Sequence, residues 1–126
     1  MSTTSLSAGL IVRALLLENP KIAGKVKKVF PLVIRECDLP YIAYRRVSLS
    51  QDVTKSGGAD TIRIEVICYA KTYEESVSIA EEVRRTLEFR QKEFSDMYLR
   101  QCYLFDSSEM WADDAYIQRL IFQVKI

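Results

Sequence analysis

The sequence contains no histidine, only three cysteines and only four glycines among its 126 residues. Histidine is the commonest general base and metal ligand, so its absence counts against most familiar enzymes and metal sites. The cysteines, Cys37, Cys68 and Cys102, are odd in number and lie more than thirty residues apart, without a C-x-x-C pair. This spacing favours neither a zinc ribbon nor a disulfide framework. We expect reduced thiols that pack in the core as small apolar side chains.

The sequence also lacks a charge imbalance and a membrane-length apolar run. Its 18 basic and 17 acidic residues give a net charge of +1, which supports neither a nucleic-acid nor an anionic-membrane partner. The apolar run from Leu6 to Leu17 contains Arg13 and is shorter than the roughly 20 residues that span a bilayer. No basic stretch precedes this run, so we expect no signal peptide and no membrane partner.

Length and composition predict one globular domain over residues 1–126.

The first predicted element is a helix that is apolar on nearly every side. Ser5 can cap a helix that begins at Leu6 and ends at Asn19-Pro20, because proline cannot continue a helix. Only Arg13 and Glu18 give this helix polar character, whereas a helix on a monomer surface normally keeps a broad polar face. The helix is therefore either the central core helix or one whose edge meets a neighbouring subunit.

The middle of the chain is predicted to form strands. The clearest signal is the alternation of apolar and polar residues from Ile62 to Ala70, which is typical of a strand with one buried face. A short edge strand at 29–34, interrupted by Pro31, and a strand from Tyr41 precede it. The segment from Gln51 to Asp60 contains Gly57-Gly58 and is predicted to be the tip of a long hairpin.

The C-terminal half is predicted to contain a surface helix and a second hairpin. Thr72 and Glu75 match a capping box, and an amphipathic helix follows to Leu87. Residues 89–96 are polar and give no clear signal. The remaining predicted segments are a strand at 97–105, a charged loop at 106–114 and a strand from 115 to the end.

The order helix, strand, strand, strand, helix, strand, strand predicts an α+β fold. We expect an antiparallel sheet of four to five strands with two helices packed on one face. Several strands carry apolar residues on the second face as well. We therefore expect another chain to bury part of that face.

The sequence supplies few candidates for chemistry. Glu109, Asp113 and Asp114 lie within one predicted loop and could bind a divalent cation through oxygen, but the spacing lacks the glycine and the alternating ligands of a calcium loop. Gly57-Gly58 is not followed by the lysine of a phosphate loop. We interpret the acidic segment as a solvated hairpin loop, and we predict no catalytic residue, no metal and no cofactor.

Two further features leave alternatives open. Trp111 is either a packing anchor or an exposed tryptophan at a subunit contact. Arg45 and Arg46, close to Tyr41 and Tyr44, come nearest to a nucleic-acid surface, although we interpret them as a solvated face. A small nucleic-acid-binding or regulatory α+β domain is therefore one alternative function. A small enzyme that uses Glu109 with Asp114 is another.

Sequence segments along nearly the whole chain resemble one family. They are the leading apolar helix, Val29-Phe30-Pro31, Pro40-Tyr41-Ile42, the strand from Ile64 to Ala70, the helix from Ser76 to Leu87 and the closing segment from Trp111 to Val124. In their order and spacing these segments resemble the tail-completion proteins of long-tailed bacteriophages and prophages. The segment at residues 89–96 is longer and more charged than this resemblance predicts.

The resemblance implies a structural virion protein. Such proteins end growth of the tail tube at its head-proximal end and join the tail to the head, and they are similar in fold to tail terminators, which close into six-membered rings. The implied partners are further copies in a homo-hexameric ring, the tail tube protein and the head connector or stopper protein. Nucleic acid is implied as a partner only in the sense that the ring would lie close to the DNA channel. The implied location is the head–tail junction of the virion, reached from the host cytoplasm during assembly, and the family has no catalytic residues to carry over.

A ring needs two different surface patches on each subunit, so we expect interface residues in loops and exposed strands. The long hairpin tip could become ordered when it docks on a tube or connector. The residues that we expect at a subunit or tail-tube interface are Thr54, Lys55, Ser56, Gly57, Gly58, Glu109, Trp111, Asp113, Asp114, Arg45 and Arg46.

Overall fold

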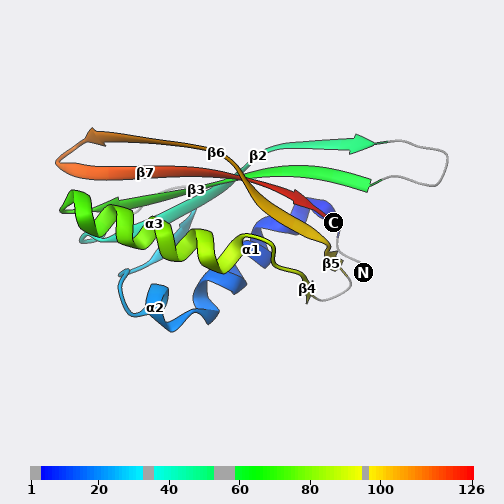
Figure 1. Cartoon of the computed structure of the whole chain (residues 1–126), viewed down its shortest axis with the longest axis horizontal. Helices are drawn as coiled ribbons and strands as arrows, with labels where there is room; N and C mark the ends of the chain where they lie inside the picture. The colour runs from blue at the N-terminus through cyan, green and yellow to red at the C-terminus, as the bar shows by residue number, and fades with distance from the viewer. Residues whose placement is uncertain (1–3, 33–35, 53–58, 95–96) are drawn as a thin grey trace.

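Helices and strands account for most of the chain in the computed structural model, which describes residues 4–32, 36–52, 59–94 and 97–126. Figure 1 shows how they are arranged. The elements, in chain order, are η1 (Ser5–Ser7), α1 (Ala8–Glu18), α2 (Pro20–Ala23), β1 (Val29–Pro31), β2 (Tyr41–Asp52), β3 (Ala59–Ala70), α3 (Tyr73–Leu87), β4 (Lys92–Phe94), β5 (Met97–Leu99), β6 (Gln101–Ala112) and β7 (Ala115–Lys125).

Five strands form one sheet in the order β1-β2-β3-β7-β6. The pairs β2–β3, β3–β7 and β7–β6 are antiparallel, whereas the short β1 runs parallel to β2. The predicted α+β fold is confirmed, and the parallel edge strand makes the sheet mixed rather than purely antiparallel. A separate two-stranded sheet, β4–β5, lies between α3 and β6 in the chain.

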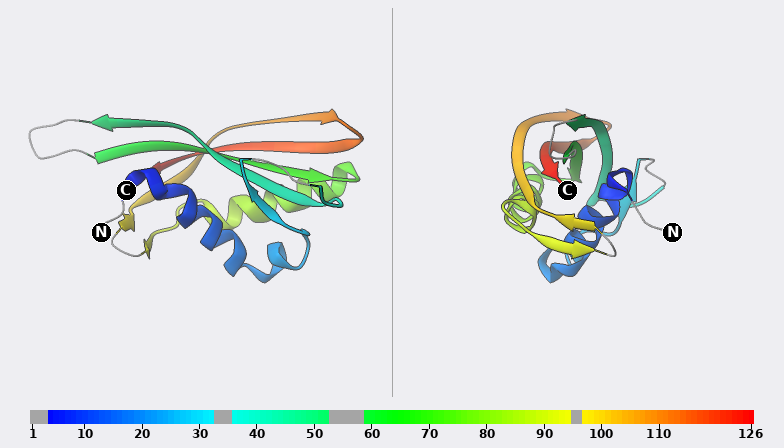
Figure 2. Two further views of the ribbon diagram at one scale, coloured as in Figure 1. Left: turned by 180° about the vertical axis from the view of Figure 1, so that it is seen from behind. Right: turned by 90° about the vertical axis from the view of Figure 1, so that its right-hand side faces the viewer.

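Helices α1 and α3 cover one face of the sheet, as Figures 1 and 2 show. The predicted alternation in β3 is confirmed, because its side chains on that face are fully buried: Ile62, Ile64, Val66, Cys68 and Ala70. Ile11, Leu15 and Leu16 of α1 and Ile79, Val83 and Leu87 of α3 belong to the same core. The removal of this apolar surface from water is the main force that holds the helices on the sheet.

The helix ends differ in detail from the sequence prediction. Thr4, rather than Ser5, caps the first turn, since its hydroxyl accepts a hydrogen bond from the Leu6 amide at 3.3 Å. Asn19 ends α1, and Pro20 then begins the short helix α2, a first-turn position that suits proline. The predicted cap of α3 is confirmed, because the Glu75 amide donates to the Thr72 hydroxyl at 3.2 Å.

The predicted charged loop at 106–114 is wrong. Strand β6 continues through Ala112 and pairs with β7 along its whole length, with a register shift between Leu104 and Asp106. Asp113 and Asp114 alone form the turn, with φ of 52° and 59°, as a two-residue turn of the tight hairpin type requires. The polar residues of this segment therefore belong to an edge strand rather than to a loop.

Two other segments also depart from the prediction. The strand predicted at 97–105 is divided, because β5 ends at Leu99 and pairs with β4, while β6 begins at Gln101. The strands of the first hairpin are longer than predicted and pair up to Asp52 and Ala59. The predicted tip residues Thr54, Lys55, Ser56, Gly57 and Gly58 lie outside the described residues.

We predict that only one of the three thiols reacts readily in the folded protein. Cys68 and Cys102 are buried in the core, and burial raises the pKa of both to about 12. Because the thiolate is the reactive form, both should resist Ellman's reagent at pH near 8. Cys37 is only half-buried. Colour development should report one thiol in the native protein and three after denaturation in urea; fast reaction of two or more native thiols would contradict the core placement.

Candidate interaction surfaces

The face of the sheet opposite the helices is organised around the carboxylate of Glu65. Glu65 lies in the middle of β3 and is only 2% exposed. Arg45 of β2 donates from Nε to one carboxylate oxygen at 2.8 Å, and Arg119 of β7 donates to the other. The register brings these residues together, since Glu65 pairs with Arg45 on one side and Arg119 lies two residues from its partner Ile121 on the other. The three side chains therefore tie the central three strands to one another.

The electrostatics of Glu65 follow from this clamp. Burial raises the pKa of the carboxyl group, but the hydrogen bonds and charges of Arg45 and Arg119 outweigh burial, so the pKa lies below its ordinary value. Glu65 is therefore ionised near neutral pH and satisfies both of its oxygens. This arrangement is a structural clamp, because no third group on the described residues hydrogen-bonds to the carboxylate.

Aromatic side chains occupy other positions on this face. The rings of Tyr41 and Tyr69 are 4.8 Å apart, and Phe30 meets Tyr41 edge to face at 5.9 Å. The Arg63 guanidinium lies over the Phe105 ring at 3.9 Å, a cation–π distance. The face that we expected another chain to bury therefore mixes charged groups with apolar groups, and these groups contact one another within the chain.

A groove of about 390 Å³ lies at the β1–β2 edge of the sheet, beside the beginning of α1. We call it the α1 groove, and its main lining residues are Leu6, Leu10, Leu32, Tyr44, Arg45 and Arg46. Its leucines are strongly exposed, at 63% for Leu6, 52% for Leu10 and 70% for Leu32. Its lining contains two arginines and no acidic residue.

Hydrogen bonds hold the walls of the α1 groove in place. Arg46 donates from Nη1 to the carbonyl of Leu6 at 3.0 Å, which joins β2 to the first turn of the N-terminal helix. The Leu32 amide donates to the carbonyl of Tyr44 at 2.8 Å. Leu32 has a φ of 60°, which a bulky side chain rarely adopts. A strained backbone thus holds an apolar side chain in solvent, and such strain is concentrated at functional positions.

The second exposed apolar surface is the closed end of the β6–β7 hairpin. We call it the hairpin end, and it consists of Glu109, Met110, Trp111, Asp113, Asp114 and Tyr116. Met110 and Trp111 are 57% and 59% exposed. Glu109 is anchored, because the Tyr73 hydroxyl and the Gln118 side-chain amide each donate to its Oε2 at 3.0 Å. The hydrogen bond to Glu109 raises the pKa of Tyr73.

The structure brings together some of the residues predicted from the sequence. Glu109, Trp111, Asp113 and Asp114 all lie at the hairpin end, whereas Arg45 and Arg46 lie on β2 beside the α1 groove. Figure 1 shows the hairpin end on the left and the beginning of α1 toward the right. The predicted interface residues thus form two separate groups.

Several residues of these surfaces were not predicted from the sequence. Leu32 gave no signal, because nothing in a single sequence marks a leucine with positive φ. Glu65 looked like an ordinary solvent-facing residue of an alternating strand. The excess of apolar residues in the leading helix was the one usable signal for Leu6 and Leu10, because it exceeded what one buried face requires.

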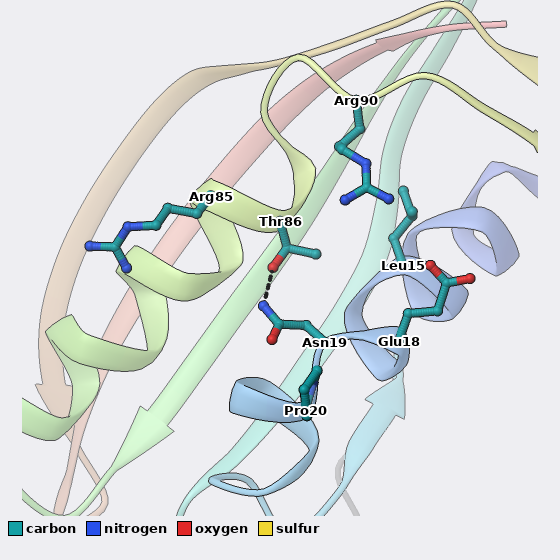
Figure 3. A pocket seen from close by; sticks show the side chains of 7 residues that line it. All are labelled: Leu15, Glu18, Asn19, Pro20, Arg85, Thr86 and Arg90. Atoms are coloured by element: carbon teal, nitrogen blue, oxygen red, sulfur yellow. Dashed lines mark hydrogen bonds between the residues drawn. The ribbon is translucent and has the colours of Figure 1, made fainter.

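A further pocket of about 410 Å³ lies between α1–α2 and α3 (Figure 3). The polar side chains that line it are hydrogen-bonded within the protein. Asn19 donates to the Thr86 hydroxyl at 2.7 Å, and Thr86 donates to the carbonyl of Glu82 at 2.7 Å. Lys92 and Glu18 form an ion pair at 2.6 Å beside it. We interpret this pocket as a joint between helices rather than as a ligand site.

The described residues contain neither a metal-binding cluster nor a helix that could span a membrane. Within residues 4–32, 36–52, 59–94 and 97–126, no group of three or more acidic or cysteine side chains is placed to hold a metal ion. In the same part of the chain, no helix has the length and apolar character that crossing a bilayer requires.

The fold and the surfaces define a small α+β domain with exposed apolar surfaces at both edges of its sheet. The family described as "Tail completion protein gp17" matches residues 11–126, and the chain belongs to this family. It is therefore a structural protein of a phage tail. A search among curated proteins gave no match.

A solved structure shares the fold. It is a chain from the "Virion of native gene transfer agent (GTA) particle", with 12% sequence identity, a TM-score of 0.77 and alignment over 90% of each chain. The likeness at this low identity concerns the fold, and it extends over nearly the whole of both chains.

We predict that the Glu65 clamp contributes to stability in a pH-dependent way. Glu65→Gln should lower the free energy of unfolding by about 2 kcal/mol near neutral pH, because it removes two charge-assisted hydrogen bonds. The pKa of Glu65 is lower in the folded than in the unfolded chain, so its contribution is present above the ordinary value of 4.5 and is lost as the pH falls through the folded value. The difference between variant and wild type should therefore shrink in acid.

Urea unfolding at several pH values measures this difference. Glu81→Gln is the matched control, because Glu81 pairs with Arg85 on the surface of α3 and its side chain is 60% exposed. The control should change stability by less than about 0.5 kcal/mol. Equal effects of the two substitutions at neutral pH would contradict a clamp at Glu65.

Proposed function

We propose that the chain caps the head-proximal end of the phage tail tube and joins it to the head connector or stopper by forming a ring. Residues 1–126 act in this proposal as one domain with a structural rather than a catalytic role. The proposed partners are further copies of the chain in a homo-hexamer, the tube protein and the connector. Its place is the head–tail junction of the virion, after assembly in the host cytoplasm.

The observation that carries this proposal is the pair of exposed apolar surfaces on a chain of the tail completion family. The α1 groove lies at the β1–β2 edge of the sheet, and the hairpin end closes the strands at the β6 edge. A ring is built from heterologous contacts, in which one patch meets a different patch on the next subunit. Two unlike patches on opposite edges satisfy this requirement.

The β2–β3 hairpin supports a contact with a second type of protein. In Figure 1 its two strands extend beyond the helices and beyond the other strands, so they form an arm. We propose that residues 54–58, the predicted tip that connects these two strands in sequence, contact the tube or the connector. The arm would then reach along the tail axis while the two edges of the sheet contact neighbouring subunits.

We predict that the purified protein forms rings on tail tubes. Electron microscopy of tubes assembled with and without the protein should show a ring at one end of each tube only when the protein is present, and tubes with a ring should stop growing. Averages of the capped ends should show sixfold symmetry. Tubes that elongate equally in both samples and carry bare ends would contradict the proposed function.

We also predict that the tip of the arm is needed for tail completion but not for folding. Replacement of residues 53–58 by Asn-Gly should close β2 and β3 with a tight turn and preserve their register. The variant should unfold at the wild-type temperature, yet phage that carry it should produce few infectious particles. A second variant replaces residues 53–58 by six Gly and Ser residues. It keeps the length of the arm but removes its side chains, so it shows which of the two the contact requires. Normal particle yields from both variants would contradict a contact at the tip.

A further inference from the structure

We propose that the hairpin end of one copy docks into the α1 groove of the next copy. This inference rests on the proposed function, since it names the contact that would close the ring. The occupant of the groove is a second copy of this chain.

The two surfaces complement each other in charge. The hairpin end includes three acidic residues, Glu109, Asp113 and Asp114, and no basic residue. The α1 groove has two arginines, Arg45 and Arg46, and no acidic residue in its lining. Arg45 is already paired with Glu65, whereas Arg46 donates to the neutral carbonyl of Leu6, so Arg46 supplies the main positive charge of the groove. Opposite charges around an apolar contact orient the partners and disfavour contact between like surfaces. The groove should therefore repel another groove and attract a hairpin end.

The apolar parts of the two surfaces also fit this pairing. The groove is a concave site with the exposed side chains Leu6, Leu10 and Leu32. The hairpin end is a projection that carries the exposed side chains of Met110 and Trp111. Tryptophan that inserts into an apolar pocket is a common centre of binding energy at protein interfaces. Glu109, held by Tyr73 and Gln118, fixes the strand beside Trp111 before binding.

Position excludes an intramolecular version of this contact. The groove lies along the β1–β2 edge, and β6 forms the other edge with β3 and β7 between them. β6 is paired with β7 from Asp106 to Ala112, so the hairpin end cannot fold back to the groove of its own chain. The contact is heterologous, and its repetition produces a ring or a filament rather than a closed pair.

Two single substitutions test the pairing. Leu10→Asp places a carboxylate in the groove, and Trp111→Ala removes the apolar centre of the hairpin end. Each variant alone should self-associate at least about tenfold more weakly than wild type in sedimentation velocity up to millimolar concentration. An equimolar mixture should form heterodimers that grow no further, because the intact hairpin end of Leu10→Asp can enter the intact groove of Trp111→Ala.

Matched controls exclude general effects of the substitutions. Leu17→Asp makes the same change on an exposed leucine of α1 outside the groove, and Phe89→Ala removes an exposed aromatic side chain away from the hairpin end. Both should associate like wild type. Circular dichroism confirms that each variant is folded.

Three results would overturn the pairing: wild type that stays monomeric throughout the concentration range, either test variant that associates like wild type, or a mixture that forms no heterodimer. These results are distinct from a failure of the proposed function. If rings cap tubes while Leu10→Asp assembles normally, the contact is wrong and the capping role stands. If the mixture forms heterodimers while tubes remain uncapped, the contact stands and the capping role is wrong.

Discussion

The burial of one face of β3 is the constraint on which the rest of the structure depends. β3 lies in the middle of the five-stranded sheet, and its alternate side chains from Ile62 to Ala70 are completely buried in a core to which α1 and α3 contribute. A shift of one residue in its register would move this apolar set to the opposite face, so the register is strongly fixed. The same register places Glu65 on the other face between Arg45 and Arg119. Core packing thus determines where the clamp forms.

This arrangement explains why the exposed apolar surfaces lie at the edges. The helices cover the central strands from one side, and charged and aromatic groups contact one another on the other side. Exposed apolar side chains remain beside the two edge strands, at Leu32 directly after β1 and at Met110 and Trp111 of β6. Clusters of exposed apolar side chains at such edges are typical of association sites. A chain with a nearly neutral net charge can still make selective contacts, because the α1 groove contains arginines without acidic residues and the hairpin end contains acidic residues without basic ones.

The sequence predicted those parts of the fold that local periodicity determines. The alternation in β3, the cap at Thr72 and the amphipathic α3 were correct because each pattern is repeated over several residues. The charged loop predicted at 106–114 was wrong, because an exposed edge strand has no buried face and so shows no alternation. Its strand character comes from pairing with β7, which a single sequence does not reveal. The four-residue α2 and the three-residue β4 are too short to give a periodic signal.

The candidate surfaces were predictable only in part for the same reason. The acidic and aromatic residues near Trp111 are close in sequence, so they could be grouped before the structure was known. The α1 groove combines Leu6, Leu32 and Arg46 from three separate elements, and only the tertiary fold brings them together. The strained backbone at Leu32 depends on its hydrogen bond to Tyr44, which is another long-range feature.

Photo-crosslinking of assembled protein tests the central claim, a head-to-tail contact between unlike edges, most directly. A benzophenone amino acid in place of Asp114, in an equimolar mixture of isotope-labelled and unlabelled chains, reports by mass spectrometry which residues lie beside the hairpin end and whether they belong to another copy. The account predicts crosslinks of mixed isotope composition to the segments around Leu6–Leu10 and Leu32. Crosslinks confined to single chains, or crosslinks between two hairpin ends, would contradict it.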